Sequence, residues 1–329
     1  MMHTRTYQIN KMTCLPIRSA VVLPVLTIII AIVTTIISLS SISAQDWQPG
    51  NKAGDRLVKS LNGVEYAFRW IPPGKFVLYG KPTSITEQRK ETKVDVTFTY
   101  GVWLLETEVT QKMWSSVMGS QPSFYQGDDR PVEKVTWKEV QKFCRKASDQ
   151  WQVEIALPTN ALWEYACLTG RDWKEILSPK NKKRPGGSDT SNEGSQRNSA
   201  APFWNTKGNG QRVGAVSYWG AVNSKGETHD VGKTIPNSWG LYDMMGNVWE
   251  MCSDYYGELP LRSVSDPTGP RRGFTHVIRG GSYSDFQSLL TLFHRSEISP
   301  SLGRRDVGFR VIAIPNQETE LLYFGSSDN

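Results

Sequence analysis

The chain has 329 residues, of which 38% are hydrophobic and 11% aromatic, and this apolar content excludes disorder throughout. Its net charge of +6 is spread along the whole sequence and does not indicate a nucleic-acid-binding protein. The 28 Gly and 18 Pro, together with the lack of a sustained heptad pattern, exclude a helical bundle and a coiled coil.

The first 44 residues predict export. Basic residues precede an uncharged apolar run over residues 20–39, and Ala44 is a small residue at a suitable cleavage position. Since the run is long enough to cross a bilayer, two alternatives stay open, a cleaved signal peptide and a retained membrane anchor. Either one places the rest of the chain outside the cytoplasm, in the periplasm, secreted, or membrane-anchored and facing outward.

Three cysteines follow this segment, Cys144, Cys167 and Cys252. An odd number allows at most one internal disulfide in an oxidising compartment, and Cys144–Cys167 is one conceivable pairing. The sequence favours buried thiols for at least two of the three. No CxxC motif occurs, which excludes a zinc knuckle and a thioredoxin-like site.

The elements expected before residue 171 are a linker, four strands and three helices. Residues 45–60 are interpreted as the linker. Alternating apolar residues between Gly and Pro turns predict strands over residues 64–70, 75–79, 93–100 and 103–108. Threonine N-caps and helical periodicity predict helices over residues 110–118, 137–148 and 161–168.

The second half of the chain is less regular. Residues 171–212 are rich in Lys, Gly, Ser and Asn and are interpreted as a variable loop insertion. Short strands follow, the last over residues 308–313, and residues 316–329 form a polar tail. Three short helices within much irregular chain predict a single α+β domain over residues 61–315, with little regular secondary structure.

Generic catalytic motifs are missing from the sequence. It contains no Walker loop, no HExxH, no GxSxG and no GxGxxG. The histidines after the export segment, His229, His276 and His294, stand singly, and a lone histidine is more often packed than a ligand.

Ten ordered segments carry a resemblance to a known family. They are residues 70–76 (WIPPGKF), 106–111 (ETEVTQ), 122–124 (PSF), 130–137 (RPVEKVTW), 157–159 (LPT), 163–167 (WEYAC), 236–244 (PNSWGLYDM), 246–250 (GNVWE), 278–283 (IRGGSY) and 308–311 (GFRV). In this order the chain, from Val64 to Ile312, resembles the formylglycine-generating enzyme family, the sulfatase-modifying factor domain. The resemblance implies a variant of the C-type-lectin-like fold.

Several large aromatic residues and glycines of these segments are predicted to stabilise the fold. The expected aromatic anchors are Trp163, Trp239 and Trp249. Gly280 and Gly281 allow a bend at the end of a strand.

Two arginines near the C-terminus are expected to brace the last strands. Arg279 and Arg310 would pair with carboxylates or carbonyls. The candidate partners are Glu108, Glu133 and Glu164. Arg295 is expected to brace a loop, and its alternative role is contact with an acidic ligand.

The resemblance also implies calcium. Hard oxygen donors with backbone carbonyls suit Ca²⁺, and the matching ligands are the side chains of Asn247 and Glu250 with the carbonyls of Val248 and Cys252. A second family site maps to Asn223 and the carbonyl of Lys225.

The family's oxidation chemistry does not carry over. The resemblance implies two cysteines after the Gly-Gly-Ser-Tyr segment, since thiolates hold the Cu(I) that activates O₂. The first would fall at Asp285 and the second near Leu290, and the chain has no cysteine after Cys252. A copper-dependent formylglycine oxidase is therefore not expected.

Three functions remain open. The first is a calcium-stabilised binding or accessory module for an extracytoplasmic protein, peptide or small ligand. The second is an O₂-dependent oxidoreductase of the non-haem iron type acting on a secreted protein or metabolite, with iron held by His229, His276, His294 and Asp285. The third is a structural partner in an envelope assembly. No nucleic acid is expected, and membrane contact is expected only through the N-terminal segment.

If a site exists, the resemblance places it beside the Gly-Gly-Ser-Tyr segment. The candidate catalytic residues are Ser282, Tyr283, Asp285 and His294, with Trp249 nearby.

Overall fold

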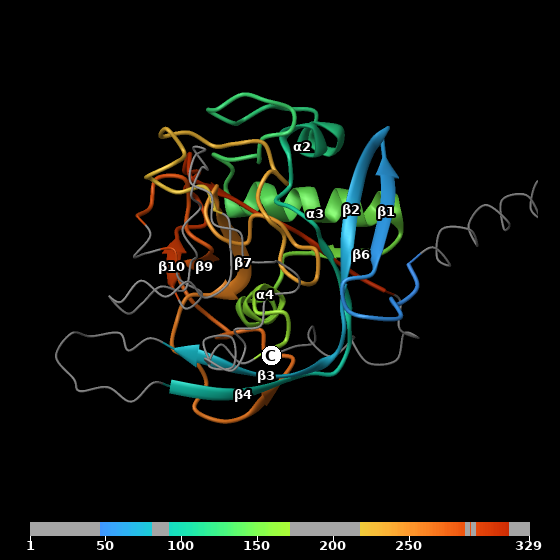
Figure 1. Cartoon of the computed structure of the whole chain (residues 1–329), viewed down its shortest axis with the longest axis vertical. Helices are drawn as coiled ribbons and strands as arrows, with labels where there is room; N and C mark the ends of the chain where they lie inside the picture. The colour runs from blue at the N-terminus through green and yellow to red at the C-terminus, as the bar shows by residue number, and fades with distance from the viewer. Residues whose placement is uncertain (1–46, 81–91, 172–217, 287–289, 291–293, 316–329) are drawn as a thin grey trace, which may run out of the picture. The chain divides into compact units, whose positions relative to one another are not determined.

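The computed structural model describes residues 47–80, 92–171, 218–286, 290 and 294–315 (Figure 1). The predicted export segment, nearly all of the predicted loop insertion and the polar tail therefore lie outside the described residues. The described residues fall in one structural unit, which begins at Trp47. None of the helices within these ranges is both long and apolar enough to cross a bilayer.

The largest sheet brings the two ends of the domain together. Its five strands lie in the order β1-β2-β5-β12-β6, with bounds Arg56–Leu61, Val64–Ile71, Val102–Leu105, Ile312–Ile314 and Glu154–Ala156. A hairpin joins β1 and β2 through Asn62 and Gly63, whose φ angles of 51° and 79° match the Asn-Gly turn that suits strand twist. Because β12 lies between β5 and β6, the last strand completes a sheet built from early parts of the chain.

Two smaller sheets complete the fold. One has the order β10-β9-β7-β11, with bounds Arg295–Ile298, His276–Arg279, Trp249–Tyr255 and Val307–Gly308. The other has the order β3-β4-β8, with bounds Gly74–Gly80, Thr92–Phe98 and Val264–Ser265. The β11–β7 and β4–β8 pairs are parallel, so chain segments far apart in sequence form both contacts.

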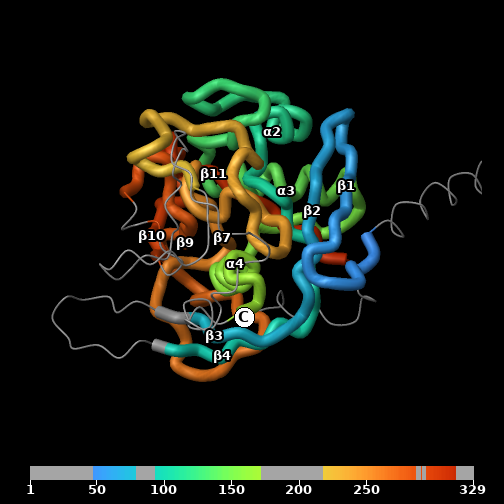
Figure 2. The backbone as a smooth tube through the Cα atoms, in the orientation of Figure 1, coloured from blue at the N-terminus to red at the C-terminus, as the bar shows by residue number. Residues whose placement is uncertain are grey.

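Threonine caps begin the three described helices, α2 (Gln111–Met118), α3 (Trp137–Trp151) and α4 (Asn160–Cys167). In each, the threonine hydroxyl accepts a hydrogen bond from the backbone N–H three residues later, which satisfies an otherwise unpaired donor. Helix α4 contacts β3, β7 and β9, and it lies between the two smaller sheets (Figures 1 and 2).

One fully buried ion pair joins most of these elements. The Arg310 guanidinium donates to both carboxylate oxygens of Glu250 in β7, from Nε and Nη2 at 2.6 Å each. Its remaining bonds go to the carbonyl oxygens of Leu105, Glu106 and Tyr242. Trp163 of α4 donates its indole N–H to Glu250 Oε2 at 2.8 Å. This cluster, here called the Arg310 hub, connects β5, β7 and α4 to the chain between β11 and β12.

A second buried pair reinforces α4. Arg279 Nη2 at the end of β9 donates to Glu164 Oε2 at 2.5 Å, and both side chains are fully buried. The expected bracing by both arginines is confirmed, and Glu164 is the one candidate partner that forms an ion pair. The partner of Arg310, Glu250, was not among the three candidates.

The α+β class and most predicted elements are confirmed, with three corrections to the boundaries. The predicted linker holds β1, and Trp47 is buried in the core. The strand predicted to reach Glu108 ends at Leu105. The predicted last strand is split into β11 and β12, because Arg310 between them directs its side chain into the hub.

Breaking the hub is expected to destabilise the whole domain. Glu250→Gln leaves the Arg310 charge buried without a counter-charge, so unfolding free energy should fall by about 3–5 kcal/mol. Lys112→Gln is the matched control, because the Lys112–Asp129 pair is exposed on both sides and should change stability by about 1 kcal/mol or less. Urea unfolding measures both variants, and equal effects would contradict the role given to the hub.

Candidate functional site

The Gly-Gly-Ser-Tyr segment makes a tight turn directly after β9. Gly280 and Gly281 have φ angles of 91° and 76°, a region that favours glycine. A Cβ at Gly280 would lie 3.1 Å from the Met244 carbonyl oxygen, so space as well as backbone angle favours glycine there. The turn is held by a hydrogen bond from Gly246 N–H to the Gly280 carbonyl. The expected bend is confirmed.

Ser282 and Asp285 are bonded to each other and close this turn. The Asp285 carboxylate accepts from the Ser282 hydroxyl at 2.7 Å and from the Ser282 N–H at 2.9 Å. The Asp285 N–H in turn donates to the Ser282 carbonyl at 3.1 Å. Ser282 is fully buried. The two side chains therefore act here as a turn brace.

Tyr283 lies beside this brace and packs edge-on against Tyr125, with ring centroids 5.4 Å apart. Burial raises the pKa of Tyr283 well above its usual range, and Tyr125 adds to the effect. Its hydroxyl therefore stays protonated at neutral pH. The Tyr283 carbonyl accepts from the Ser224 hydroxyl at 2.7 Å, which ties the turn to the preceding loop.

The three histidines are not brought together. His229 stacks on Trp219 at 3.8 Å, His276 stacks on Trp137 at 4.0 Å, and His294 lies edge-on to Trp249 at 5.2 Å. No cluster of three His, Cys, Asp or Glu able to hold a metal occurs in the described part of the chain. The expected iron set of His229, His276, His294 and Asp285 is therefore not assembled.

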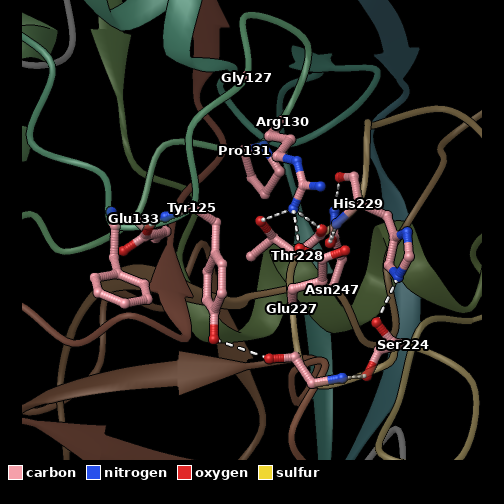
Figure 3. A network of polar contacts seen from close by, with 12 residues as sticks. Tyr125, Gly127, Arg130, Pro131, Glu133, Ser224, Glu227, Thr228, His229 and Asn247 are labelled. Carbon is pink, nitrogen blue, oxygen red and sulfur yellow. Dashed lines mark hydrogen bonds and ion pairs between the residues drawn. The ribbon is translucent and has the colours of Figure 1, made fainter.

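The side chains expected to bind calcium have other partners. Asn247 Oδ1 accepts from the His229 N–H at 2.9 Å and its Nδ2 donates to the His229 carbonyl (Figure 3). Glu250 belongs to the Arg310 hub. Val248 and Cys252, expected to contribute carbonyls, are both fully buried beside it. The Asn247–Glu250 set therefore serves the scaffold in this structure.

The side chain expected at the second calcium site also has hydrogen-bond partners within the protein. Asn223 Oδ1 accepts from the Gly220 N–H and its Nδ2 donates to the Tyr218 carbonyl, at 2.8 Å each. Lys225 has a φ of 60°, and the turn it forms leads into the network of Figure 3. In that network Arg130 donates to the Thr228 carbonyl and Tyr125 to the Gly226 carbonyl, so two loops brace each other.

Glu108, which the sequence offered as an arginine partner, is instead a buried acid that forms no ion pair within the described residues. Both of its carboxyl oxygens are buried and have no hydrogen-bond partner within the described ranges. Burial raises the pKa of Glu108 well above its usual range, and the neighbouring charges of Asp243 and Glu250 raise it further. Asp243 is itself buried, its pKa raised by burial, and it is held by the Gly232 N–H and the Thr234 hydroxyl. This pair of acids, here called the Glu108 pocket, offers the carboxyl oxygens that Ca²⁺ prefers, with Glu250 and Arg310 as charged neighbours.

The signal for this pocket was present but ambiguous. Glu108 lies in the quoted segment 106–111 and Asp243 in the segment 236–244. Only the fold shows that Arg310 turns to Glu250 and leaves Glu108 unpartnered.

Comparison with known proteins identifies the class. The family model of the sulfatase-modifying factor enzyme 1-like domain (FGE-sulfatase) matches residues 63–314, which is most of the chain. The chain therefore belongs to this family, as its motifs predicted.

Relatives in this family include enzymes and an accessory protein. The chain is 26% identical over 238 residues to the chaperone protein LppX of Paenibacillus barcinonensis, covering 62% of this chain and 77% of that protein. It is 31% identical over 210 residues to the formylglycine-generating enzyme of Streptomyces coelicolor, covering 60% and 57%. The mouse enzyme is 28% identical over 204 residues, covering 61% and 48%. The chain thus spans about half the length of these two enzymes.

Solved structures share the fold. Treponema denticola variable protein 1 matches 79% of this chain and 99% of its own, with a TM-score of 0.59 and 25% identity. PvdO from Pseudomonas aeruginosa matches 80% of this chain and all of its own, with a TM-score of 0.58 and 20% identity. The second likeness shows the fold alone.

The thiols are expected to be unreactive in the folded protein. Cys144, Cys167 and Cys252 are free thiols, and Cys144 and Cys252 are buried, which confirms that at least two of the three are buried thiols. Burial raises the pKa of Cys144 to about 12 and raises that of the other two, so thiolate is scarce at pH 7. Titration with a thiol-specific disulfide reagent should label these three only after denaturation. Rapid labelling of Cys144 in the native protein would contradict its burial.

Proposed function

We propose that the chain is an exported accessory protein of the formylglycine-generating enzyme family, with a binding role and no copper-dependent oxidation. The observation that carries this proposal is the chemistry at the two positions where the resemblance implies copper ligands. Asp285 is a hard oxygen donor already bonded to Ser282, and Leu290 is fully buried against Gly281. Neither group is a soft ligand for Cu(I).

The accessory role draws support from a relative. LppX, which the chain matches over 77% of that protein's length, is named a chaperone protein. A chaperone acts by binding a client protein and needs no redox centre. The proposed partner is therefore an extracytoplasmic protein or peptide, and the apolar run before Ala44 supports export of the domain.

Exposed aromatic residues offer a contact surface beside the Gly-Gly-Ser-Tyr turn. Phe286, just after the turn, is 66% exposed, and Phe124, next to Tyr125, is 47% exposed. The Arg305 guanidinium stacks over the Phe124 ring at 3.7 Å. Aromatic and arginine side chains dominate the energetics of protein contacts, so this surface suits a peptide partner.

Calcium stabilisation belongs to the same proposal, with a revised ligand set. The unpartnered Glu108 carboxyl and Asp243 would hold the ion, because a buried carboxylate without a counter-charge is costly. A bound divalent cation would supply the missing charge and oxygen coordination.

Calcium should stabilise the folded chain. At a free Ca²⁺ concentration of about 100 times Kd, binding adds about 2.7 kcal/mol, so chelation should lower Tm by about 5 °C or more. Glu108→Gln should abolish this Ca²⁺-dependent difference. Glu133→Gln is the matched control, since Glu133 is also buried and has one unpartnered oxygen. Differential scanning calorimetry measures Tm with and without chelator for each variant. A Ca²⁺ effect on Tm that survives Glu108→Gln would contradict this ligand set.

The chain is expected to lack formylglycine oxidase activity. With Cu(I), O₂ and a cysteine-containing sulfatase peptide, aldehyde formation should stay at the level of buffer, while the Streptomyces coelicolor enzyme converts the same peptide. Mass spectrometry of the peptide measures both. Conversion above background would overturn the proposal, and one iron per purified chain with O₂ consumption would favour the oxidoreductase alternative.

A further inference from the structure

A cleft of about 450 Å³ lies at the far end of β7 from Trp249. The loop over residues 256–275, which includes β8 and runs beneath β4 in Figure 1, forms one wall. The apolar lining includes Leu259 and Val264 of that loop and Leu78 of β3. A volume of this size fits a small organic molecule.

A buried acidic group, Asp254, lines the cleft together with Glu258 and Asp266. Asp254 is 5% exposed, and its Oδ2 accepts from the Asn160 N–H at 2.7 Å and the Ser253 hydroxyl at 3.4 Å. Burial raises the pKa of Asp254 to about 6. No ion pair to Asp254 forms within the described ranges. The side-chain oxygen of Asn160, another lining residue, also has no hydrogen-bond partner there.

A basic group, Arg295, also lines the cleft. Arg295 in β10 donates from Nη2 to the Gly257 carbonyl at 2.9 Å, and its guanidinium lies 5.4 Å from the Tyr256 ring centroid. The expected bracing of a loop by Arg295 therefore occurs. Within the described residues Arg295 forms no ion pair, although the negative charges of Glu164 and Asp254 act on it from a greater distance.

Asp254 and Arg295 favour opposite charges on a ligand. A simple cation would meet Asp254 but also the Arg295 guanidinium, and a simple anion would meet Arg295 but also Asp254. A molecule with both charges satisfies both groups, because charge-assisted hydrogen bonds are strongest where both partners are largely withdrawn from water.

We propose that this cleft binds a small zwitterion with an apolar side chain, of the free α-amino acid class. The ammonium group would face Asp254 and Asn160, the carboxylate would face Arg295, and the side chain would lie against Leu259 and Val264. This binding is independent of the accessory role and of the Glu108 pocket.

Three matched probes test the proposal on the purified full chain by isothermal titration calorimetry. L-leucine carries both charges, L-leucinamide lacks the carboxylate, and N-acetyl-L-leucine lacks the ammonium. Leucine should bind at least tenfold more tightly than either derivative, a difference of about 1.4 kcal/mol. A derivative that binds as tightly as leucine, or no heat of binding for leucine at millimolar concentration, overturns the proposal.

Variants locate the site on the protein. Arg295→Gln should remove the preference for leucine over leucinamide, and Asp254→Asn should remove the preference for leucine over N-acetyl-leucine. Arg262→Gln is the control, because Arg262 is an exposed arginine of the same loop that does not line the cleft. Arg295→Lys keeps the charge and should retain the preference for leucine over leucinamide. If leucine binds to Arg295→Gln with unchanged selectivity, the ligand lies elsewhere.

Discussion

The buried pair of Arg310 and Glu250 is the interaction on which the rest of the domain depends. Removing a guanidinium and a carboxylate from water costs free energy. In this pair the cost is offset by hydrogen bonds to carbonyls of two further segments and by the Trp163 indole N–H. Because every partner comes from a different element, the pair can form only when those elements are all in place. It therefore specifies one arrangement of a chain with little regular secondary structure.

The shortage of regular secondary structure also explains why residues at the expected sites have structural roles. Loops that lack ladder hydrogen bonds must satisfy their backbone groups with side chains. Asn247 holds the His229 backbone, and Asp285 holds Ser282. These polar residues can look like ligands or nucleophiles in a motif and still act as braces. The Arg310 hub has a further consequence, since it takes Glu250 and leaves Glu108 without a partner.

The proposed functions use what the scaffold leaves unsatisfied. Calcium is proposed to bind at the buried acids Glu108 and Asp243, and a zwitterion is proposed to meet both Asp254 and Arg295 in the cleft that they line. The aromatic surface at Phe286 and Phe124 supports a contact with a partner protein. The Glu108 pocket, the cleft and the aromatic surface all lie on the fold of the family to which the chain belongs. Its relatives include enzymes and a protein named a chaperone.

The sequence by itself determined the family, the α+β class and the helix starts, because caps, periodicity and ordered motifs are local signals. It did not determine that residues 56–61 form a strand, that the last strand is split, or that three histidines stay apart. Tertiary structure decided those points. The pairing of arginines with acids depends on contacts between residues that are far apart in the chain, such as Glu250 and Arg310. The same contacts decide which acid forms no ion pair.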